Sequence, residues 1–419
     1  MAARSAIRYT LAMTSLWLAE ADPLPNPSPL PAACDVAVIG GGIAGIATAL
    51  HLAERGVQVA VLERRTVASR ASGRNDGQLL LGLGEHYHRI HGQFGATKAR
   101  ELWAFLARNH VATQATLQRC AVACDLVAAG GLRLAETAHE WQELQEAAAL
   151  LAAEGKAHQL VPPAELPRWL PPARGFCGAL HLPGEAIVQP AAMVRGLAAA
   201  AQRAGAAVVE GAEVVALHGE SGDFAVALAD GRQLRASAVV HCTSTLAREL
   251  DPTGFLDRVV FPFRGQIVAT DPLPADVAAQ FPPYAMSSNF CYEYFRIARG
   301  RFVIGGKRWS VKGEELGILD DDSQNPAITA NLLEYVREHF PSLAGTAFPH
   351  VWTGIMAGTP DGLPLLGALP GQPGAYVLGA FNGYGLSFAF LAGRCLAEIL
   401  VDGQPADPAA GLFAPRRFG

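Results

Sequence analysis

The sequence has few of the features that mark membrane or nucleic-acid-binding proteins. Only 17% of its 419 residues are charged, and 33 lysines and arginines against 38 aspartates and glutamates leave a net charge of −5. Without a basic surplus to neutralise phosphates, nucleic acid is excluded as a partner. No apolar run reaches the roughly 20 residues that cross a bilayer, so we expect no membrane span. Half of the residues are hydrophobic, which excludes a disordered chain.

Signs of cysteine pairing are also missing. The seven cysteines are an odd number, and no CxxC motif occurs among them. A protein from an oxidising compartment would favour an even, paired set. We therefore expect reduced thiols and a cytoplasmic location.

The N-terminus carries only a weak version of a targeting signal. Arg4 and Arg8 precede an apolar stretch at 9–18, and residues 19–21 (AEA) imitate a small-residue cleavage site. Hydroxyl side chains interrupt the apolar stretch, which favours an ordinary lead segment over an exported chain. Five alternating prolines at 22–31 predict that this lead is extended and non-helical.

The first folded unit follows the prolines. The apolar run at 35–39 predicts a strand, residues 46–55 have helical spacing, and 57–62 predicts a second buried strand. Together they have the size of one βαβ crossover, about 30 residues. The length fits two to three domains or one large α/β unit.

Helical and strand-like segments mix along the rest of the chain. Helices are predicted over 98–119, 138–153, 191–204, 326–339 and 386–400, and strands over 207–209, 213–217, 224–228, 238–242, 259–263, 266–269, 292–297, 302–304 and 375–378. Asn325 is a candidate N-cap, with Pro326 at the first helical position. A proline-punctuated loop is predicted at 162–172, and a polar tail follows the last helix. Because no linker separates the segments, we expect two interleaved modules.

A glycine-rich turn joins the first strand to the first helix. The hexapeptide 40–45 (GGGIAG) satisfies GxGxxG: Gly40 permits the tight turn, Gly42 lets a pyrophosphate approach the backbone, and Gly45 lets the helix pack on the strand. The helix N-terminus then offers amide groups to the phosphates. An acidic residue at the end of the second strand, Glu63, can accept hydrogen bonds from an adenosine ribose. The predicted dinucleotide contacts here are Gly40, Gly42, Ile43, Ala44, Gly45 and Glu63.

The fingerprint alone does not distinguish NAD from FAD. A second fingerprint is expected if an enzyme reduces its flavin with NAD(P)H, and we find none. Arg64 and Arg65 could pair with the 2′-phosphate of NADP, but Glu63 would repel that phosphate. We read these arginines as surface charge, with Arg64 still a candidate contact of the cofactor.

Motifs spread over almost the whole chain resemble the D-amino acid oxidase, glycine oxidase and sarcosine oxidase family of FAD enzymes, and within it the γ-glutamylputrescine oxidase-like branch. They are SLWLAEADPLPNPSPLP at 15–31, VIGGGIAGIATALHLAERG at 38–56 with VLERR at 61–65, ASGRNDGQ at 71–78, CDL at 124–126, FRGQ at 263–266, YEYFRI at 292–297, WTGIMAGTPDGLPLLG at 352–367 and FNGYGLSFAFLAGR at 381–394.

The resemblance implies an α/β fold in which a Rossmann-like FAD-binding domain is interleaved with an antiparallel-sheet substrate domain. The implied division gives 33–90, 186–250 and 350–400 to the FAD-binding domain and mainly 91–185 and 251–349 to the substrate domain, between a lead at 1–32 and a tail at 401–419. Implied flavin contacts are Ser72, Arg74, Asn75, Val214 beside the adenine, Thr243, and the closing turn of Gly383, Tyr384, Gly385, Leu386 and Ser387. A helix N-terminus after that turn would stabilise the negative charge of reduced flavin.

Two departures from the family pattern bear on the substrate. In amino-acid-oxidising members the WxGxRxGT stretch carries an arginine that pairs with the substrate carboxylate, and here that position is Met356. An α-carboxylate would lose its bidentate partner, so amines become more favoured than amino acids. Asp76 replaces a glycine of the branch motif; it could attract a substrate ammonium or orient a water, or be an ordinary loop aspartate. Residues 354–359 hold no cysteine, so we expect noncovalent FAD.

The strand at 292–297 supplies the other substrate candidates. Tyr292, Tyr294 and Arg296 alternate and share one face, with Glu293 on the other. The family places this strand along the substrate cavity, which makes Tyr292, Glu293 and Tyr294 the predicted substrate contacts. The spacing of three histidines at 86–91 matches no zinc pattern, so we predict no metal site.

These features predict an FAD enzyme that oxidises the C–N bond of a primary or secondary amine by hydride transfer to flavin N5. Water would then hydrolyse the imine to a carbonyl product, with molecular oxygen or an electron carrier as acceptor. One alternative is an amino-acid or 2-hydroxy-acid oxidase or dehydrogenase that binds its carboxylate through Arg296 or Lys307. Another is a flavoprotein that uses FAD structurally. The sequence does not name the amine.

Overall fold

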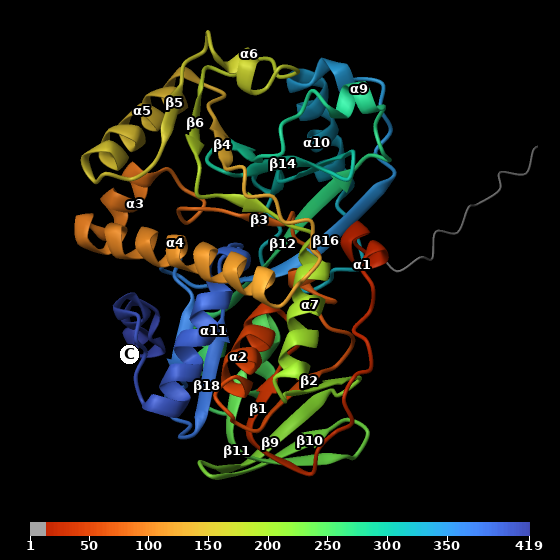
Figure 1. Cartoon of the computed structure of the whole chain (residues 1–419), viewed down its shortest axis with the longest axis vertical. Helices are drawn as coiled ribbons and strands as arrows, with labels where there is room; N and C mark the ends of the chain where they lie inside the picture. The colour runs from red at the N-terminus through yellow and green to blue at the C-terminus, as the bar shows by residue number, and fades with distance from the viewer. Residues whose placement is uncertain (1–13) are drawn as a thin grey trace, which may run out of the picture.

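The computed structural model describes residues 14–419 and contains two eight-stranded sheets, one in each half of the molecule (Figure 1). The helices are α1 Leu16–Glu20, α2 Ile43–Ala53, α3 Tyr87–Phe94, α4 Ala96–Arg119, α5 Ala138–Ala153, α6 Leu166–Trp169, α7 Pro190–Arg203, α8 Phe255–Val259, α9 Ala275–Ala278, α10 Pro326–His339 and α11 Gly385–Asp402. The signal-like Arg4 and Arg8 lie outside the described residues. Within 14–419, no helix is long and apolar enough to cross a membrane.

The first sheet is built around parallel strands. Its order is β17 Leu365–Ala368, β18 Ala375–Gly379, β11 Gln233–His241, β1 Ala33–Ile39, β2 Val59–Glu63 and β8 Ala207–Glu210, and the hairpin of β9 Val214–Glu220 and β10 Asp223–Leu228 is attached to β11. β1 runs parallel to β2 and to β11, which confirms the predicted βαβ unit. Helix α2 packs against α11 and α7.

One glycine sets how closely the helices on this sheet approach. A Cβ on Gly393 of α11 would lie 2.8 Å from the Cβ of Ala47 on α2. Only a residue without a side chain allows this crossing. The two closely packed helices, α2 and α11, both begin in the central region of the molecule, near β3, β12 and β16 (Figure 1).

The second sheet is mainly antiparallel. Its order is β16 His350–Gly358, β12 Phe261–Ala269, β15 Arg301–Gly305, β14 Glu293–Ala298, β13 Ala285–Ser288, β4 Gly131–Leu134, β6 Ala179–Leu182 and β5 Gln159–Val161. A separate pair, β3 Gln78–Leu79 and β7 Ala186–Ile187, lies between the halves (Figure 1). The predicted division gave 350–400 to the FAD-binding domain, but β16 pairs with β12 in the second sheet. The sequence could not show this pairing, because β12 is distant in the chain.

Two local predictions were wrong, and one helix was not predicted. The segments 259–263 and 266–269 are not two strands: Val259 ends α8, and β12 runs unbroken from Phe261 to Ala269. The loop at 162–172 contains the short helix α6. The segment 22–31 is non-helical, as predicted, and the helix that was not predicted is α1 before it, whose Trp17 is 1% exposed and meets Trp352 edge-to-face at 6.0 Å. These errors concern segments whose conformation depends on distant packing partners.

The last segment, 401–419, is also more than a polar tail. Phe413 is fully buried, with its ring 5.0 Å from Phe105 of α4 and 5.5 Å from Phe388 of α11, both edge-to-face. Asp407 pairs with Arg108 of α4 at 2.7 Å. The segment therefore closes the outer side of the α4–α11 contact.

We expect Phe413→Ala to lower the free energy of unfolding by about 3–5 kcal/mol, since it removes a buried ring and leaves a cavity between two helices. Urea denaturation of the purified protein measures this change. Val401→Ala is the control, because Val401 is 45% exposed and its truncation should change stability by less than about 0.5 kcal/mol. Equal stabilities of the two variants would contradict a structural role for the C-terminal segment.

Candidate active site

The glycine-rich turn has the geometry that close approach of a cofactor requires. Gly40 has a φ of +109°, and a Cβ there would lie 2.6 Å from the carbonyl oxygen of Cys242. A Cβ on Gly45 would lie 2.0 Å from the carbonyl oxygen of Gly40. Larger residues at either position would force the turn open.

The N-terminus of α2 faces a cavity. Gly42, Ile43 and Ala44 line this cavity. The N-cap residue is Gly42, which has no side chain that could bond the helix amides, and the first turn holds no acidic residue. The Ile43 amide donates to Ser72 Oγ at 3.0 Å, which fixes the following loop against this end of the helix. The positive end of this 11-residue helix lies at the cavity and is suited to bind an anion such as a pyrophosphate.

Glu63 stabilises the turn from outside the cavity lining. Its Oε2 accepts from the Gly41 amide and its Oε1 from the Arg65 amide, both at 2.8 Å. Burial raises the pKa of this carboxyl, although both amides lower it. Arg64 lies 3.6 Å from Glu213, beside the half-buried Val214. The roles of Glu63, Arg64 and Val214 toward an adenosine remain predictions.

The cavity has a volume of about 410 Å³ and lies where the two halves meet. Fifteen of the predicted site residues line it: Gly42, Ile43, Ala44, Ser72, Arg74, Asn75, Asp76, Tyr292, Tyr294, Met356, Gly383, Tyr384, Gly385, Leu386 and Ser387. Gly40, Gly45, Glu63, Arg64, Val214, Thr243 and Glu293 are not part of its lining. Thus one cavity brings together the glycine-rich turn, the 72–76 loop, the substrate strand and the closing turn.

A second helix N-terminus opens into the same cavity. The closing turn has Gly383 at φ +93°, and α11 begins at Gly385 without a side-chain cap or an acidic first turn. Ser387 Oγ accepts from the Leu80 amide at 2.8 Å, which ties this helix to β3 and the adjoining loop. The positive ends of α2 and α11 therefore both favour negative charge in the cavity.

Thr243 is a further predicted cofactor contact and lies beside the glycine-rich turn. Its hydroxyl oxygen is shielded from solvent and has no hydrogen-bond partner among the described residues. Its methyl group would be 3.3 Å from a Cβ on Gly40, so the hydroxyl lies at the glycine-rich turn. Buried polar groups normally have a partner, but Thr243 does not line the cavity, so its contact with a cofactor remains a prediction. The glycine-rich turn and the N-termini of α2 and α11, whose N-cap residues make no side-chain hydrogen bond to the helix, fit FAD.

Arg74 lines the cavity but is committed to the protein backbone. Its Nε donates to the Ser69 carbonyl at 3.1 Å, and its Nη1 donates to the carbonyls of Asp321 at 2.9 Å and Thr353 at 3.1 Å. Burial lowers its pKa, and the Asp321 carboxylate acts in the opposite direction. The side chain thereby joins the 72–76 loop to β16.

The sheet wall of the cavity is shaped by glycines. Tyr294 of β14 lies opposite Gly305 of β15, where a Cβ would come within 2.3 Å of the tyrosine ring. Met356 of β16 reaches between two further glycines: a Cβ on Gly265 would lie 2.9 Å from its Cε, and one on Gly383 would lie 3.6 Å from its Sδ. The ring and the thioether therefore lie flat over the sheet and leave space above them.

Glu293 was wrongly predicted as a substrate contact. It is fully buried on the opposite face of β14, where its Oε1 accepts from Trp309 Nε1 at 2.7 Å and lies 3.5 Å from Lys307 Nζ. The alternation of side chains along a strand explains this, because neighbours of Tyr292 and Tyr294 must face away from the cavity. Lys307 is likewise outside the cavity lining.

Sequence reasoning missed the outer wall of the cavity, which Glu85, Phe290, Cys291 and Arg308 help to form. Residues 289–291 all have positive φ, at 46°, 57° and 64°. Such backbone costs of order 1–3 kcal/mol a residue and persists only where the surroundings hold it. No local turn motif marks this segment, so only its tertiary contacts could have revealed it.

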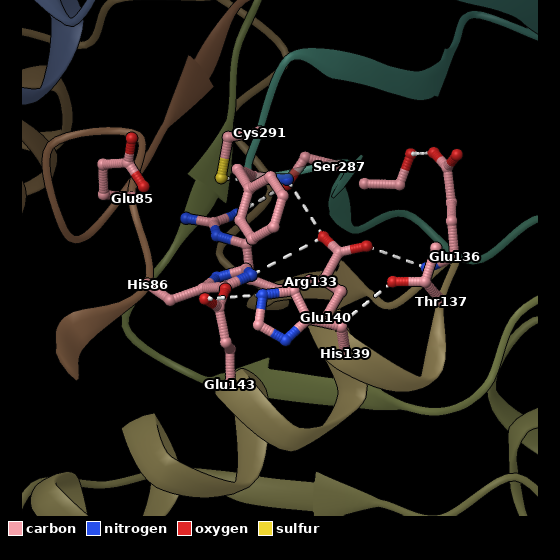
Figure 2. Close-up of polar contacts among 12 residues, drawn as sticks. Glu85, His86, Arg133, Glu136, Thr137, His139, Glu140, Glu143, Ser287 and Cys291 are labelled. Carbon is pink, nitrogen blue, oxygen red and sulfur yellow. Dashed lines mark hydrogen bonds and ion pairs between the residues drawn. The ribbon is translucent and has the colours of Figure 1, made fainter. Parts of the chain in front are cut away.

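Helix α5 supplies those contacts (Figure 2). Glu140 lies 3.5 Å from His86 Nε2. It also accepts from the Phe290 amide at 2.9 Å, and Glu143 accepts from Arg89 at 3.0 Å. The Arg89 guanidinium lies 3.8 Å above the Phe290 ring. Two carboxylates of one helix thus hold both the 85–89 segment and the 289–291 turn against the cavity.

Comparisons with known proteins agree with this geometry. Residues 35–399 match the family model described as FAD dependent oxidoreductase, with the short name DAO. The chain belongs to this family. A DAO-family chain is an FAD-dependent oxidoreductase, and the mixed α/β architecture predicted from the sequence is confirmed.

The DAO-family relatives include two curated enzymes. Gamma-glutamylputrescine oxidoreductase of Escherichia coli (strain K12) is 28% identical over 371 residues, covering 88% of this chain and 83% of the relative. Glycine oxidase of Geobacillus kaustophilus (strain HTA426) is 27% identical over 389 residues, covering 92% and 97%. Both pairings span nearly the whole of each protein.

Solved structures show the same fold. Glycine oxidase from Geobacillus kaustophilus has a TM-score of 0.75 at 24% identity, covering 90% of this chain and 96% of that one. L-proline dehydrogenase from P. horikoshii has a TM-score of 0.78 at 20% identity, covering 93% and 98%. At these identities the likeness concerns the fold alone.

Proposed function

We propose that this enzyme uses FAD to oxidise the C–N bond of a primary or secondary amine that carries no α-carboxylate. The observation that carries this proposal is the position of Met356, whose apolar side chain lies over the sheet wall of the cavity where amino-acid-oxidising relatives are expected to hold an arginine. A thioether offers no charge-assisted hydrogen bond to a carboxylate. The two curated relatives are named for a polyamine derivative and for glycine, so their names cover both an amine and an amino acid as substrates.

The other cations near the cavity do not replace that arginine. Arg74 is bound to backbone carbonyls, as described above. Arg296 does not line the cavity: its Nη2 donates to the Val188 carbonyl at 2.7 Å, and its guanidinium lies 4.9 Å from the Trp17 ring. Lys307 pairs with Glu293 outside the lining. These positions weigh against a carboxylate bound through Arg296 or Lys307.

Among the described residues, Arg308 is the remaining cation of the cavity lining, and it lies toward the outside. Its guanidinium is 4.9 Å from the Phe263 ring and 5.9 Å from that of the exposed Tyr292, and it pairs with Glu314 at 3.6 Å. A charge at this entrance can contact the far end of a long substrate, away from the reacting carbon.

When bound, FAD supplies the two-electron acceptor for the reaction. The chain positions the amine carbon and excludes water with the side chains of Tyr294, Met356 and Tyr384. The N-terminus of α11 would stabilise the negative charge that reduction brings, and the N-terminus of α2 would hold the pyrophosphate. Burial raises the pKa of the cavity thiols Cys242 and Cys291, so both are protonated near neutral pH. This supports noncovalent FAD.

The test is anaerobic mixing of the FAD-loaded enzyme with pairs of compounds that differ only by an α-carboxylate, an amine and its parent amino acid. We expect the amine of each pair to bleach the flavin absorbance at least about 10-fold faster, since the loss of one charged hydrogen-bonding partner costs roughly 1.5–3 kcal/mol. Faster bleaching by the amino acids would overturn the proposal. No bleaching by any compound would favour a structural role for FAD.

Seven free cysteines and the absence of a spanning helix among residues 14–419 support a cytoplasmic location, which we also propose. The acceptor that reoxidises the flavin is molecular oxygen or an electron carrier. Measuring flavin reoxidation with and without oxygen separates these two.

A further inference from the structure

Asp76 is an enclosed carboxylate that opens into the substrate end of the cavity. It stands in the short loop between the 71–73 turn and β3, and it lines the same space as Tyr294 and Met356. Its Oδ1 accepts from the Gln78 amide at a long 3.3 Å. No cation within residues 14–419 forms an ion pair with it at 4.0 Å or less. Its partly accessible surface faces the cavity, because protein surrounds the group on its other sides.

The charged neighbours of Asp76 act from a distance. Arg296 of β14 and Arg133 of β4 lower its pKa, but both guanidinium groups have other acceptors, the Val188 carbonyl for Arg296 and the Leu81 carbonyl and Glu185 for Arg133. Burial is the larger effect and raises the pKa of Asp76 to about 6. At neutral pH the carboxylate is therefore ionised but weakly compensated.

Tyr294 is the remaining titratable neighbour, on the strand that carries Arg296. Burial first, and then Asp76, raises the pKa of its hydroxyl, so it stays protonated. A protonated hydroxyl can donate a hydrogen bond but cannot accept a proton from an ammonium. Asp76 is thus the proton acceptor of this end of the cavity.

We propose that Asp76 is a catalytic residue that takes the proton of the substrate ammonium on binding. This inference rests on the proposed amine oxidation. An alkylamine is mostly protonated at neutral pH, with a pKa of about 10 as for lysine. Its nitrogen must be neutral, with a free electron pair, before the adjacent C–H bond can release its hydrogen together with the bonding electrons.

The step is balanced. One N–H bond of the ammonium breaks and one O–H bond forms on Asp76, which converts an ion pair into a neutral amine and a neutral carboxylic acid. The enclosed cavity favours these neutral forms because it disfavours charge. Bound FAD would accept the hydrogen and the two bonding electrons from the carbon, and Asp76 would later release its proton to solvent.

Asp76→Asn tests the proposal through its pH dependence. In the unchanged enzyme, kcat/KM for anaerobic flavin reduction should rise to a plateau through about pH 6, the pKa of Asp76. The asparagine variant must capture the rare neutral amine from solution. Its kcat/KM should therefore be about 300-fold lower at pH 7.5, rise about tenfold per pH unit, and approach the unchanged enzyme near pH 10. A merely structural loss would not be restored by high pH.

Glu85→Gln is the matched comparison, because Glu85 is the other acidic residue lining the cavity and pairs with Arg89 at 3.4 Å. It should keep the fall in kcat/KM below pH 6. Loss of that fall in Glu85→Gln would assign the group that titrates near pH 6 to Glu85 and would overturn the proposal. So would a pH-independent loss in Asp76→Asn.

The unchanged enzyme gives a second test if the variant loses FAD. With amines of different pKa, the acid limb of kcat/KM should stay near pH 6 when Asp76 takes the proton. A limb that moves with the pKa of each amine would overturn the proposal while leaving amine oxidation intact. Absence of flavin reduction at every pH would instead contradict the proposed function itself.

Discussion

Gly45→Ala is expected to yield a protein that purifies with at least about 10-fold less FAD than the unchanged enzyme. The added Cβ would lie 2.0 Å from the Gly40 carbonyl oxygen and 3.2 Å from a methyl of Val38, both in the βαβ unit. The contact with Gly40 is to backbone, so it can be relieved only by moving the turn away from α2. That movement would displace the amides of the anion site. The ratio of flavin to protein absorbance measures the loss.

Gly92→Ala is the control for this substitution. Gly92 lies within helix α3, and a Cβ there would meet no atom within 4 Å. Alanine should be tolerated or slightly stabilising at that position. Normal flavin content in Gly45→Ala would show that the turn does not hold the cofactor, whereas loss in both variants would point to a general effect on folding.

The best sequence predictions came from segments with complete local signals. Helix α10 begins and ends at the predicted residues, Pro326 and His339, and the Asn325 side chain accepts from the Ala327 amide as an N-cap should. Helix α5 also matches, with Thr137 as its cap. In these helices capping and apolar spacing agree, and tertiary packing does not override them.

The wrong predictions share a dependence on distant partners. The sequence 259–269 contains proline and glycine that suggest two short strands, yet pairing with β16 along its whole length keeps β12 continuous. Trp17 folds into a helix because its indole donates to the Asn75 carbonyl at 2.6 Å and packs on Trp352. Neither partner is visible from the local sequence.

The candidate site divides in the same way. Its glycine turn and 72–76 loop are contiguous motifs, so the sequence could identify them. Its outer wall combines Glu85, the turn at 289–291 and Arg308, which come together only through the carboxylates of α5 and the order of the second sheet. Glu293 is a different kind of error, because alternation along the strand already placed it on the face opposite Tyr292 and Tyr294, and the family motif was followed instead.

Met356→Arg is expected to shift the substrate preference of the enzyme from amines toward the corresponding α-amino acids. The guanidinium would enter the cavity from β16 between Gly265 and Gly383, where the thioether now lies. A bidentate pair with a carboxylate is worth roughly 1.5–3 kcal/mol, and repulsion of the ammonium acts on both compounds and cancels in the comparison. The ratio of the two kcat/KM values for one amine and amino-acid pair should therefore change about 10- to 150-fold. Anaerobic flavin reduction measures both values in one preparation.

Met356→Leu separates the charge from the change of shape. Leucine keeps an apolar side chain of similar volume, so the preference for amines should remain. If Met356→Arg binds FAD and still prefers amines as strongly as the unchanged enzyme, position 356 does not determine recognition of the carboxylate. A shift in both variants would mean that cavity shape, and not the missing positive charge, selects the substrate.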